Sequence, residues 1–361
     1  MNPAPRIRVA IVGSGDIARI AHLPAVEALA EHLDLVAAVD LELARARAVA
    51  DHWHIPAAYD DLGDMLAAER PELVLICTPP AEHRPAIITC LEAGAWVWCE
   101  KPPALSLAEY DEIAAHEREG GPYASYVFQH RFGSAAAHLR AQIAAGDLGR
   151  MLVGICHTLW FRDDDYYAVP WRGRFETEGG GPTMGHGIHQ MDLMLHLLGD
   201  WTEITALTGT LARDVQTEDV SLAAVRFESG ALVSVVNSVL SPRETSYLRF
   251  DFTEATVELT HLYGYDNSSW RWTPAPHRED VTDLWSPETD VPSSHTVQLA
   301  ALVEALRAGV RPAASGADGR RVLELIAGLY ASAATRTVVR RDQLTADHPV
   351  HQSMSGVHVH V

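Results

Sequence analysis

Short hydrophobic runs alternate with helix-like stretches through residues 6–128. The run at 73–77 (LVLIC) has no polar position, which is typical of a parallel strand buried on both faces. Strands separated by single helices predict βαβ units, right-handed crossovers and a parallel sheet. The predicted strands are residues 6–12, 33–39, 73–77, 95–99 and 123–128, and the predicted helices are residues 17–30, 43–53, 62–68, 85–93 and 106–118.

The pattern changes in the second part of the chain, where strand-like runs follow one another with few helices between them. Ser229-Gly230 has the character of a two-residue hairpin turn. Grouped strands of this kind predict an α+β domain on a large, mainly antiparallel open sheet. We therefore expect a Rossmann domain over residues 1–130 and a second domain over 131–361. The predicted strands here are residues 151–161, 204–211, 221–227, 232–239, 247–252 and 256–260, with helices at 188–198, 297–308 and 320–335.

Composition narrows the possible partners. The chain has 361 residues, enough for about two domains. Its formal net charge of −20 argues against nucleic acid and anionic membranes as partners. The apolar runs are shorter than the ~20 residues of a membrane helix. The start of the chain lacks the pattern of a signal peptide. Four cysteines, none in a C-x-x-C spacing, fit a reducing cytoplasm.

A G-x-G-x-x-A pattern occupies residues 13–18, directly after the first predicted strand and at the start of a helix. In that position it predicts a dinucleotide site. Gly13 would allow the tight turn, Gly15 would admit a pyrophosphate, and Ala18 would let the helix pack closely on the sheet. The helix N-terminus offers N–H groups to the phosphates. The residues of this loop expected to contact the cofactor are Gly13, Ser14, Gly15, Asp16 and Ile17.

Asp40 ends the second predicted strand, where a carboxylate accepts the ribose hydroxyls of NAD. Leu41 follows it, so no arginine adjoins Asp40 to bind a 2′-phosphate. Arg45 and Arg47 belong to the next predicted helix. The sequence therefore favours NAD over NADP.

Two further strand ends carry polar residues. Residues 78–80 (TPP) and then His83 follow the fourth strand, and Glu100-Lys101-Pro102 follows the fifth. Ligands of open α/β sheets bind at the carboxyl ends of their strands. Lys101 is the candidate for hydrogen bonding a substrate hydroxyl and moving its proton, with a surface lysine as the alternative. The other residues expected near the cofactor are Thr78, Pro79, His83 and Glu100.

Residues 179–193 read GGGPTMGHGIHQMDL. Together with the glycine pattern, T-P-x-x-x-H and E-K-P, this motif resembles the Gfo/Idh/MocA oxidoreductase family over nearly the whole chain. The resemblance implies a substrate between two domains, oligomer contacts (a dimer or tetramer) through the open sheet, and reversible oxidation of a sugar, inositol or related polyol hydroxyl. It implies that Lys101 and His189 are the catalytic pair, and that Gln129 takes the place of an asparagine near the cofactor. Histidine suits acid–base work because its ordinary pKa lies near neutrality.

One position departs from the family pattern. An aspartate usually stands four residues before the histidine, and here that position is Gly185. Three interpretations follow. In the first, Lys101 and His189 are sufficient; in the second, His186 or Asp192 replaces the missing carboxylate; in the third, ordinary dehydrogenase chemistry is lost.

The histidines do not predict a metal site. On one helix, His186 and Asp192 would point about 120° apart, and His189 and His196 would be about 10 Å apart along the axis. The chain ends in HVHV, which we interpret as a solvated tail.

Aromatic residues gather between positions 160 and 175, among three aspartates and without a clear period. Such a loop suits a polyhydroxylated ring, with apolar faces and a polar rim, although packing onto the sheet is the alternative. Arg172 could donate to hydroxyls or hold a carboxylate. The residues expected to contact the substrate are Trp160, Tyr167, Arg172, His186 and Asp192.

The sequence thus predicts a cytoplasmic, NAD-dependent dehydrogenase of a sugar or polyol, with no metal. Two alternatives remain. One is a relative that uses NAD transiently, for sugar modification or redox-assisted glycoside cleavage. The other is a non-catalytic protein that senses NAD or a sugar.

Overall fold

The computed structural model describes residues 5–278 and 286–356, so the terminal HVHV lies outside the described residues. The chain divides into two compact units. The first comprises residues up to Ala104, Glu109–Val127 and His295–Arg320. The second comprises Leu105–Ala108, Phe128–Ser294 and the residues from Arg321 onward.

The first unit is built on a six-stranded sheet in the order β3-β2-β1-β4-β5-β6, with every neighbouring pair parallel. This order confirms the predicted Rossmann fold, and its switch point lies between β1 and β4. The loops after these two strands therefore flank the ligand crevice expected in such sheets. The strands are β1 (Ile7–Val12), β2 (Leu33–Val39), β3 (Ala57–Tyr59), β4 (Leu73–Ile76), β5 (Trp96–Cys99) and β6 (Ala124–Tyr126).

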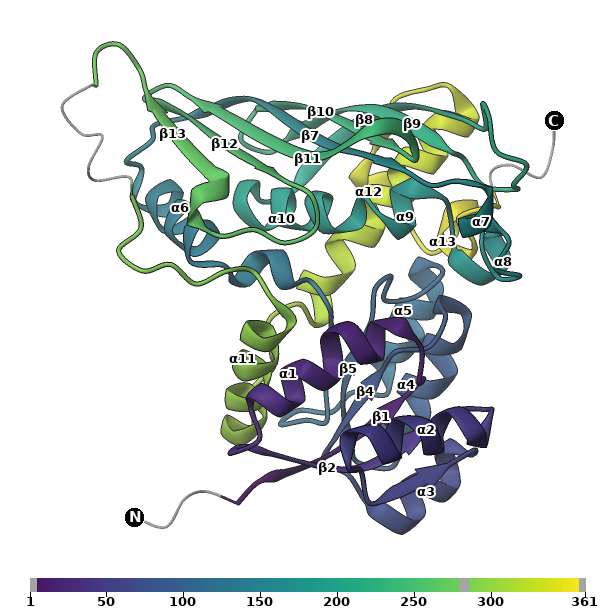
Figure 1. The fold of residues 1–361 in the computed structure, drawn as a ribbon. Coiled ribbons are helices and arrows are strands. Elements are labelled where there is room, and N and C mark those ends of the chain that lie inside the picture. The colour runs from purple at the N-terminus through teal and green to yellow at the C-terminus, as the bar shows by residue number, and fades with distance from the viewer. Residues whose placement is uncertain (1–4, 279–285, 357–361) are drawn as a thin grey trace. The chain divides into compact units, whose positions relative to one another are not determined.

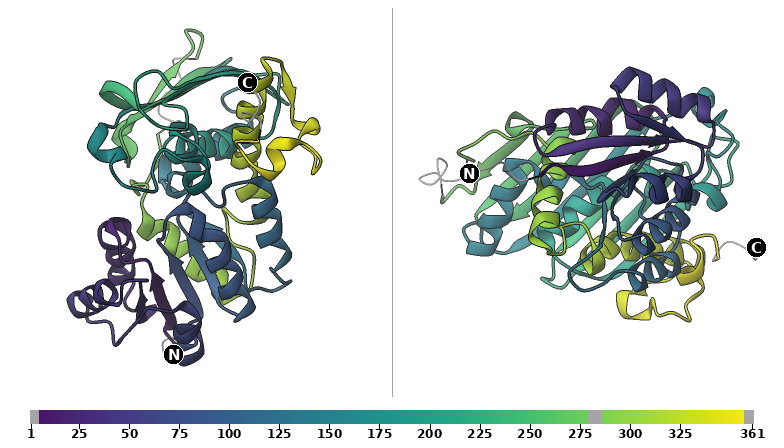
Figure 2. Two further views of the ribbon diagram at one scale, coloured as in Figure 1. Left: turned by 90° about the vertical axis from the view of Figure 1, so that its right-hand side faces the viewer. Right: turned by 90° about the horizontal axis from the view of Figure 1, so that it is seen from below.

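Helices cover both faces of this sheet (Figure 2). The core on one face gathers alternate residues of β1, such as Val9 and Ile11, against α1, α2 and α11. Leu299, Leu302 and Val303 of α11 are buried in this core, so the structure groups residues 295–320 with the first unit, whereas the sequence grouped them with the second. The helices are α1 (Leu23–Ala28) preceded by η1 (Ala18–His22), α2 (Leu43–Trp53), α3 (Leu62–Glu69), η2 (Pro80–Glu82), α4 (His83–Glu92), α5 (Leu107–Ala115) and α11 (His295–Ala308).

The second unit is built on an eight-stranded sheet in the order β13-β12-β11-β7-β10-β9-β8-β14. Only β7 and β10 pair in parallel, which confirms the mainly antiparallel sheet. The hairpin between β9 and β10 has Gly230 at a φ of 86°, a conformation that favours glycine. The strands are β7 (Met151–Phe161), β8 (Trp201–Gly209), β9 (Val220–Phe227), β10 (Leu232–Ser238), β11 (Leu240–Phe252), β12 (Ala255–His261), β13 (Trp270–Pro274) and β14 (Val339–Arg340).

Helices lie along one face of this sheet, and the opposite face is open (Figure 1). Nearly every residue of α10 is buried, because this helix packs under β7 and β11. The helices are η3 (Gln129–Phe132), α6 (Ser134–Ala145), α7 (Asp164–Tyr167), α8 (Phe175–Glu178), α9 (Pro182–Gly185), α10 (Ile188–Leu198), η4 (Asn267–Ser269), α12 (Gly316–Thr335), η6 (Arg341–Gln343) and α13 (Pro349–Gln352).

None of the helices in the described ranges has the length and apolar character that a bilayer span requires.

Candidate active site

The glycine loop lies where β1 ends, against the ends of β2 and β4. The backbone N–H of Gly13 donates to Val39 O at 2.8 Å, and Cys77 N donates to Val12 O at 2.7 Å. Gly13 has a φ of 92°, and a Cβ there would lie 2.8 Å from the carbonyl carbon of Cys77. Only glycine satisfies both the backbone angle and this close approach.

The rest of the loop leaves room and polar groups for a ligand. A Cβ built at Gly15 meets nothing within 4 Å. The hydroxyls of Ser14 and Thr78 are buried, and neither has a hydrogen-bond partner among the described residues. Buried polar groups are normally satisfied, so these two hydroxyls fit a bound pyrophosphate. The residues present therefore fit a dinucleotide.

Asp40 links the glycine loop to the end of β2. Its carboxylate accepts the backbone N–H groups of Ser14, at 2.9 Å, and Glu42, at 3.0 Å. An ionised carboxylate has about four acceptor positions, so Asp40 retains capacity for ribose hydroxyls. The following Leu41 is 89% exposed.

The helix after the glycine loop begins with a π turn, η1, that the sequence did not reveal. Its wide turn closes with a hydrogen bond from Leu23 N to Ala18 O, five residues back. The turn buries His22 completely. The ring Nε2 of His22 lies 2.9 Å from Glu100 Oε1, so the π turn connects the cofactor loop to the E-K-P segment.

Glu100, which is expected near the cofactor, has a buried side chain that contacts two histidines. It is 4% exposed, and it contacts His22 and His295, whose Nε2 lies 3.3 Å from the same oxygen. Burial opposes ionisation of Glu100, but hydrogen bonds from the two histidines outweigh it and hold the pKa well below its ordinary value. The second carboxylate oxygen accepts the backbone N–H of Lys101 at 3.2 Å.

Both ring nitrogens of His83, which is expected near the cofactor, contact backbone carbonyls. Its Nδ1 lies 2.8 Å from Pro102 O and its Nε2 lies 2.9 Å from Thr78 O. Burial lowers the pKa of His83, against the effect of these carbonyls. The side chain thus ties the end of β4 to the E-K-P segment.

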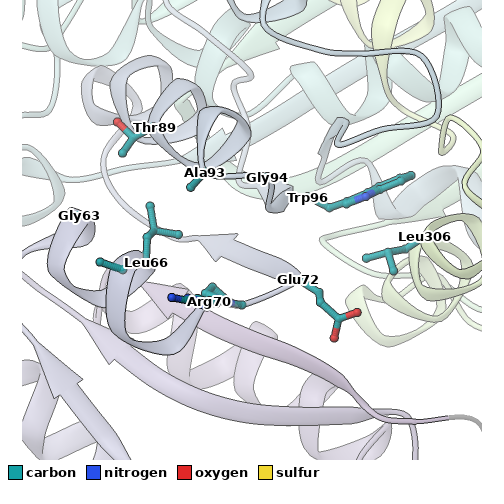
Figure 3. A pocket seen from close by; sticks show the side chains of 11 residues that line it. Gly63, Leu66, Arg70, Glu72, Thr89, Ala93, Gly94, Trp96 and Leu306 are labelled. Atoms are coloured by element: carbon teal, nitrogen blue, oxygen red, sulfur yellow. The ribbon is translucent and has the colours of Figure 1, made fainter.

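Thr78, Pro79 and Lys101 all follow the carboxyl ends of β4 and β5, as expected. Lys101 is only partly buried. A separate pocket of about 740 Å³ lies at the opposite, amino ends of these strands (Figure 3). Arg70, Glu72 and Trp96 line it. Because ligands of such sheets bind at the carboxyl edge, we assign no role to this pocket.

In the second unit, two glycines of the 179–193 motif lie directly against other residues. A Cβ at Gly181 would overlap the carbonyl oxygen of Glu218, and a Cβ at Gly187 would overlap the amide of Asn237. The buried Glu218 carboxylate accepts the N–H groups of Gly181, at 3.0 Å, and Thr183, at 3.1 Å. The Tyr330 hydroxyl donates to the same carboxylate. These contacts fix the chain just before α10.

His189 lies on α10 and is 1% exposed. Its ring centroid is 5.1 Å from that of His130 and 5.9 Å from that of Tyr263. His261 lies 5.0 Å from His130, and burial lowers its pKa to about 4. The sequence did not single out His130 or His261, although His130 adjoins Gln129.

Gln129 is 2% exposed, and neither atom of its side-chain amide has a hydrogen-bond partner among the described residues. Such a group is costly to bury unless something else satisfies it. This observation supports the expectation that Gln129 contacts a ligand.

The aromatic segment includes two short helices, α7 and α8, and contacts His186. The His186 Nε2 lies 3.3 Å from the Tyr166 hydroxyl, and its ring centroid lies 5.3 Å from that of Trp160. The Arg172 guanidinium stacks on Tyr166 at 3.8 Å and lies 3.6 Å from Glu178. Tyr167 packs edge-on against Tyr166. The segment therefore combines packing with a polar, aromatic surface.

Asp192 was considered a substitute for the carboxylate missing at Gly185. The structure pairs it with Arg131 in a bidentate contact, and both side chains are buried. The Arg131 Nε donates to Asp192 Oδ2 at 2.6 Å. Asp192 is therefore committed to an ion pair. Gly185 itself has open space where a Cβ would stand.

Comparison with known proteins agrees with this geometry. A family model described as an oxidoreductase family with an NAD-binding Rossmann fold, GFO_IDH_MocA, matches residues 7–127. A model of the GFO/IDH/MocA C-terminal domain matches residues 136–258. The chain belongs to the Gfo/Idh/MocA family. It is an oxidoreductase with an NAD-binding Rossmann domain.

Relatives of this Gfo/Idh/MocA protein span almost the whole chain. D-glucoside 3-dehydrogenase of Escherichia coli is 28% identical over 92% of the chain and 97% of the relative. Myo-inositol 2-dehydrogenase of Thermotoga maritima is 23% identical, with coverages of 88% and 94%. The structure of the WlbA dehydrogenase of Bordetella pertussis with NADH and UDP-GlcNAcA has a TM-score of 0.82 at 25% identity, with coverages of 93% and 99%.

The steric constraint at Gly181 is testable. We expect Gly181→Ala to lower the free energy of unfolding by about 1–3 kcal/mol, because the added methyl overlaps rigid backbone. Gly185→Ala, four residues on, has open space and serves as the control. Urea denaturation of both variants measures the difference, and equal stability of the two would contradict this account.

The buried ion pair gives a second prediction. Asp192→Ala leaves the Arg131 guanidinium buried without its carboxylate, and we expect a loss of about 3–5 kcal/mol. Asp342→Ala, which removes the mostly exposed partner of Arg340, should change little. Denaturation curves of both variants measure the two losses in the free energy of unfolding. A similar small loss in each would show that the buried pair contributes little to stability.

Proposed function

We propose that this protein is an NAD-dependent dehydrogenase that oxidises a secondary alcohol of a sugar, inositol or related polyol, with Lys101 and His189 as its acid–base groups. The observation that carries the proposal is the lysine content of the chain. Lys and Arg together number 28, and Lys101 is the only lysine, so the other 27 are arginines. This single lysine side chain follows the carboxyl end of β5, in the same unit as the dinucleotide loop.

Lysine and arginine differ in ways that matter beside a reacting oxygen. The guanidinium is a planar group with a fixed fork of donors, whereas the ammonium is a compact point charge. An ammonium can donate to one hydroxyl oxygen. We propose that Lys101 donates to the substrate oxygen and steadies the negative charge that develops as its proton leaves.

His189 is proposed to accept the proton of that hydroxyl and return it in the reverse direction. The imidazole is held on a buried helix among other rings, which limits its rotation. The bound nicotinamide would supply the hydride acceptor. Position 185 is a glycine, and Asp192 is engaged by Arg131. We therefore propose that Lys101 and His189 act without the carboxylate that the family usually has.

The proposed binding residues follow from the same geometry. The loop 13–17, Asp40, Thr78, Pro79 and Gln129 would hold NAD, and Asp40 would repel the 2′-phosphate of NADP. Trp160, Tyr167, Arg172 and His186 would contact a polyhydroxylated substrate. The relatives named above, which act on a D-glucoside and on myo-inositol, support this substrate class.

The activity can be tested with NAD and a panel of glycosides, sugars, inositols and sugar acids. We expect reduced cofactor to accumulate with at least one polyol. Lys101→Ala and His189→Ala should each lower kcat by about 10²–10⁴-fold, because the first removes the donor proposed to stabilise the developing charge and the second removes the proposed proton acceptor. Lys101→Arg should also lower kcat, because a planar guanidinium does not replace a compact ammonium. The affinity for NADH, measured by fluorescence, should change little. His351→Ala is the control, since His351 is a buried histidine elsewhere in the second unit.

Other outcomes identify the alternatives. Tight NAD binding without turnover of any polyol would indicate a sensor. Conversion of a glycoside without net reduced cofactor would indicate the redox-assisted route.

We further propose a cytoplasmic homo-oligomer that associates through the open face of the second-unit sheet. Leu207 and Leu222 are direct partners on β8 and β9, and they are 63% and 49% exposed. Val153 and Leu232 are also about half exposed. Exposed apolar patches of this kind mark association surfaces. The four cysteines are free and buried, which fits a reducing compartment.

Association gives the next prediction. The double change Leu207→Glu and Leu222→Glu should convert a dimer or tetramer into monomers, because two charges would be buried at the contact. Light scattering coupled to size exclusion measures the mass. Val310→Glu places a charge on an exposed residue of the first unit and should leave the mass unchanged. A monomeric unaltered protein would rule out the association.

A further inference from the structure

We infer that His22, Glu100 and His295 form a buried positioning network that holds the backbone of Lys101 and connects it to the cofactor-binding turn. This inference rests on the proposed role of Lys101. The three residues come from η1, the residue after β5, and the first residue of α11. Their side chains are 0%, 5% and 8% exposed, so water does not compete with the contacts between them.

The two oxygens of the Glu100 carboxylate have different partners. Its Oε1 lies 2.9 Å from His22 Nε2 and 3.3 Å from His295 Nε2. Its Oε2 accepts the backbone N–H of Lys101. A buried carboxylate needs several donors to offset its desolvation, and two imidazoles and one amide supply them here. The imidazoles therefore fix the plane of the carboxylate that holds Lys101.

The chain just after Lys101 is held as well, because His83 Nδ1 contacts the carbonyl of Pro102. Lys101 is thus fixed from both sides by buried side chains, while its own side chain remains partly exposed. Through His22 the network reaches the π turn, in which Arg19 N donates to Gly15 O. The cofactor loop and Lys101 are therefore connected by a series of contacts within the first unit.

The same three side chains converge closely enough to hold a metal ion, since their ligand atoms lie within 4.8 Å of one another. A metal-bound imidazole almost always donates its second N–H to an acceptor. The Nδ1 of His22 is buried and has no partner among the described residues. We therefore assign the cluster to hydrogen bonding.

The single lysine allows a direct measurement. Protein labelled with nitrogen-15 lysine should give one backbone amide signal, that of Lys101. Glu100→Gln keeps the shape of the side chain and removes its charge, so this signal should move. His295→Ala should move it too, and His295→Gln, which restores a donor, should return it towards its original position. His351→Ala is the control and should leave it unchanged.

Kinetics test the consequence for the reaction. Glu100→Gln and His295→Ala should lower kcat by about tenfold to a hundredfold, the scale expected for a misplaced catalytic group, while NADH affinity stays within about threefold. His295→Gln should recover most of kcat. A purely structural role would instead lower the melting temperature and the NADH affinity together.

Three results would overturn the inference: an unmoved lysine signal in Glu100→Gln and His295→Ala, an unchanged kcat in both, or one equivalent of metal bound to the purified protein and lost in Glu100→Gln. If the unaltered protein turns over no polyol, the proposed function fails, and the lysine signal still tests the positioning network.

Discussion

The sheet edge after β1 depends on hydrogen bonds that draw three strands together at one point. Gly13 N donates a hydrogen bond to Val39 O, and Cys77 N donates one to Val12 O, so the ends of β2, β1 and β4 meet at the glycine loop. The loop can turn there only because Gly13 lacks a Cβ that would strike the backbone of Cys77. The groups of the first unit that are assigned to the dinucleotide follow these strand ends, including Asp40 at the end of β2.

The second unit must also hold a functional residue in place, and it does so with buried carboxylates. A buried helix, α10, must be held in one register for His189 to keep its orientation. The chain before it is locked by Glu218, which accepts two backbone N–H groups, and the helix itself is locked by the ion pair between Asp192 and Arg131. Charges buried in this way cost desolvation energy, and each is offset by several hydrogen bonds. Both units thus use buried carboxylates to fix backbone next to a proposed catalytic residue.

Much of the fold follows from local patterns in the sequence. Alternating strands and helices indicated the parallel sheet, and the grouped strands indicated the antiparallel one. The three-residue β3 was missed because Ala57–Tyr59 is too short to show a period. The π turn was missed because no local pattern in the sequence marks it, and the contact that His22 makes there is with Glu100, 78 residues away. The sequence predicted the helix at 297–308 but carried no information about which core it joins.

In the candidate site, too, the sequence did not reveal contacts between residues that are distant along the chain. The sequence identified the residues that stand at strand ends, since position alone suggests their exposure to a ligand. It could not separate those whose side chains remain available from those engaged by neighbours, and Glu100, His83 and Asp192 belong to the second group. One informative signal needed no structure, namely that Lys101 is the only lysine in the chain.

This composition also clarifies how an acidic chain binds an anionic cofactor. The net charge of −20 is spread over the surface, where solvent screens it beyond about 10 Å. The phosphates would instead meet backbone N–H groups of the glycine loop and the hydroxyls of Ser14 and Thr78, none of which carries a formal charge. Arginine provides positive charge elsewhere in the chain, largely in ion pairs, and so leaves the single ammonium for position 101. A substitution of Lys101 by arginine would keep the charge but replace a compact ammonium donor with a planar guanidinium, which is why charge alone does not explain the lysine at this position.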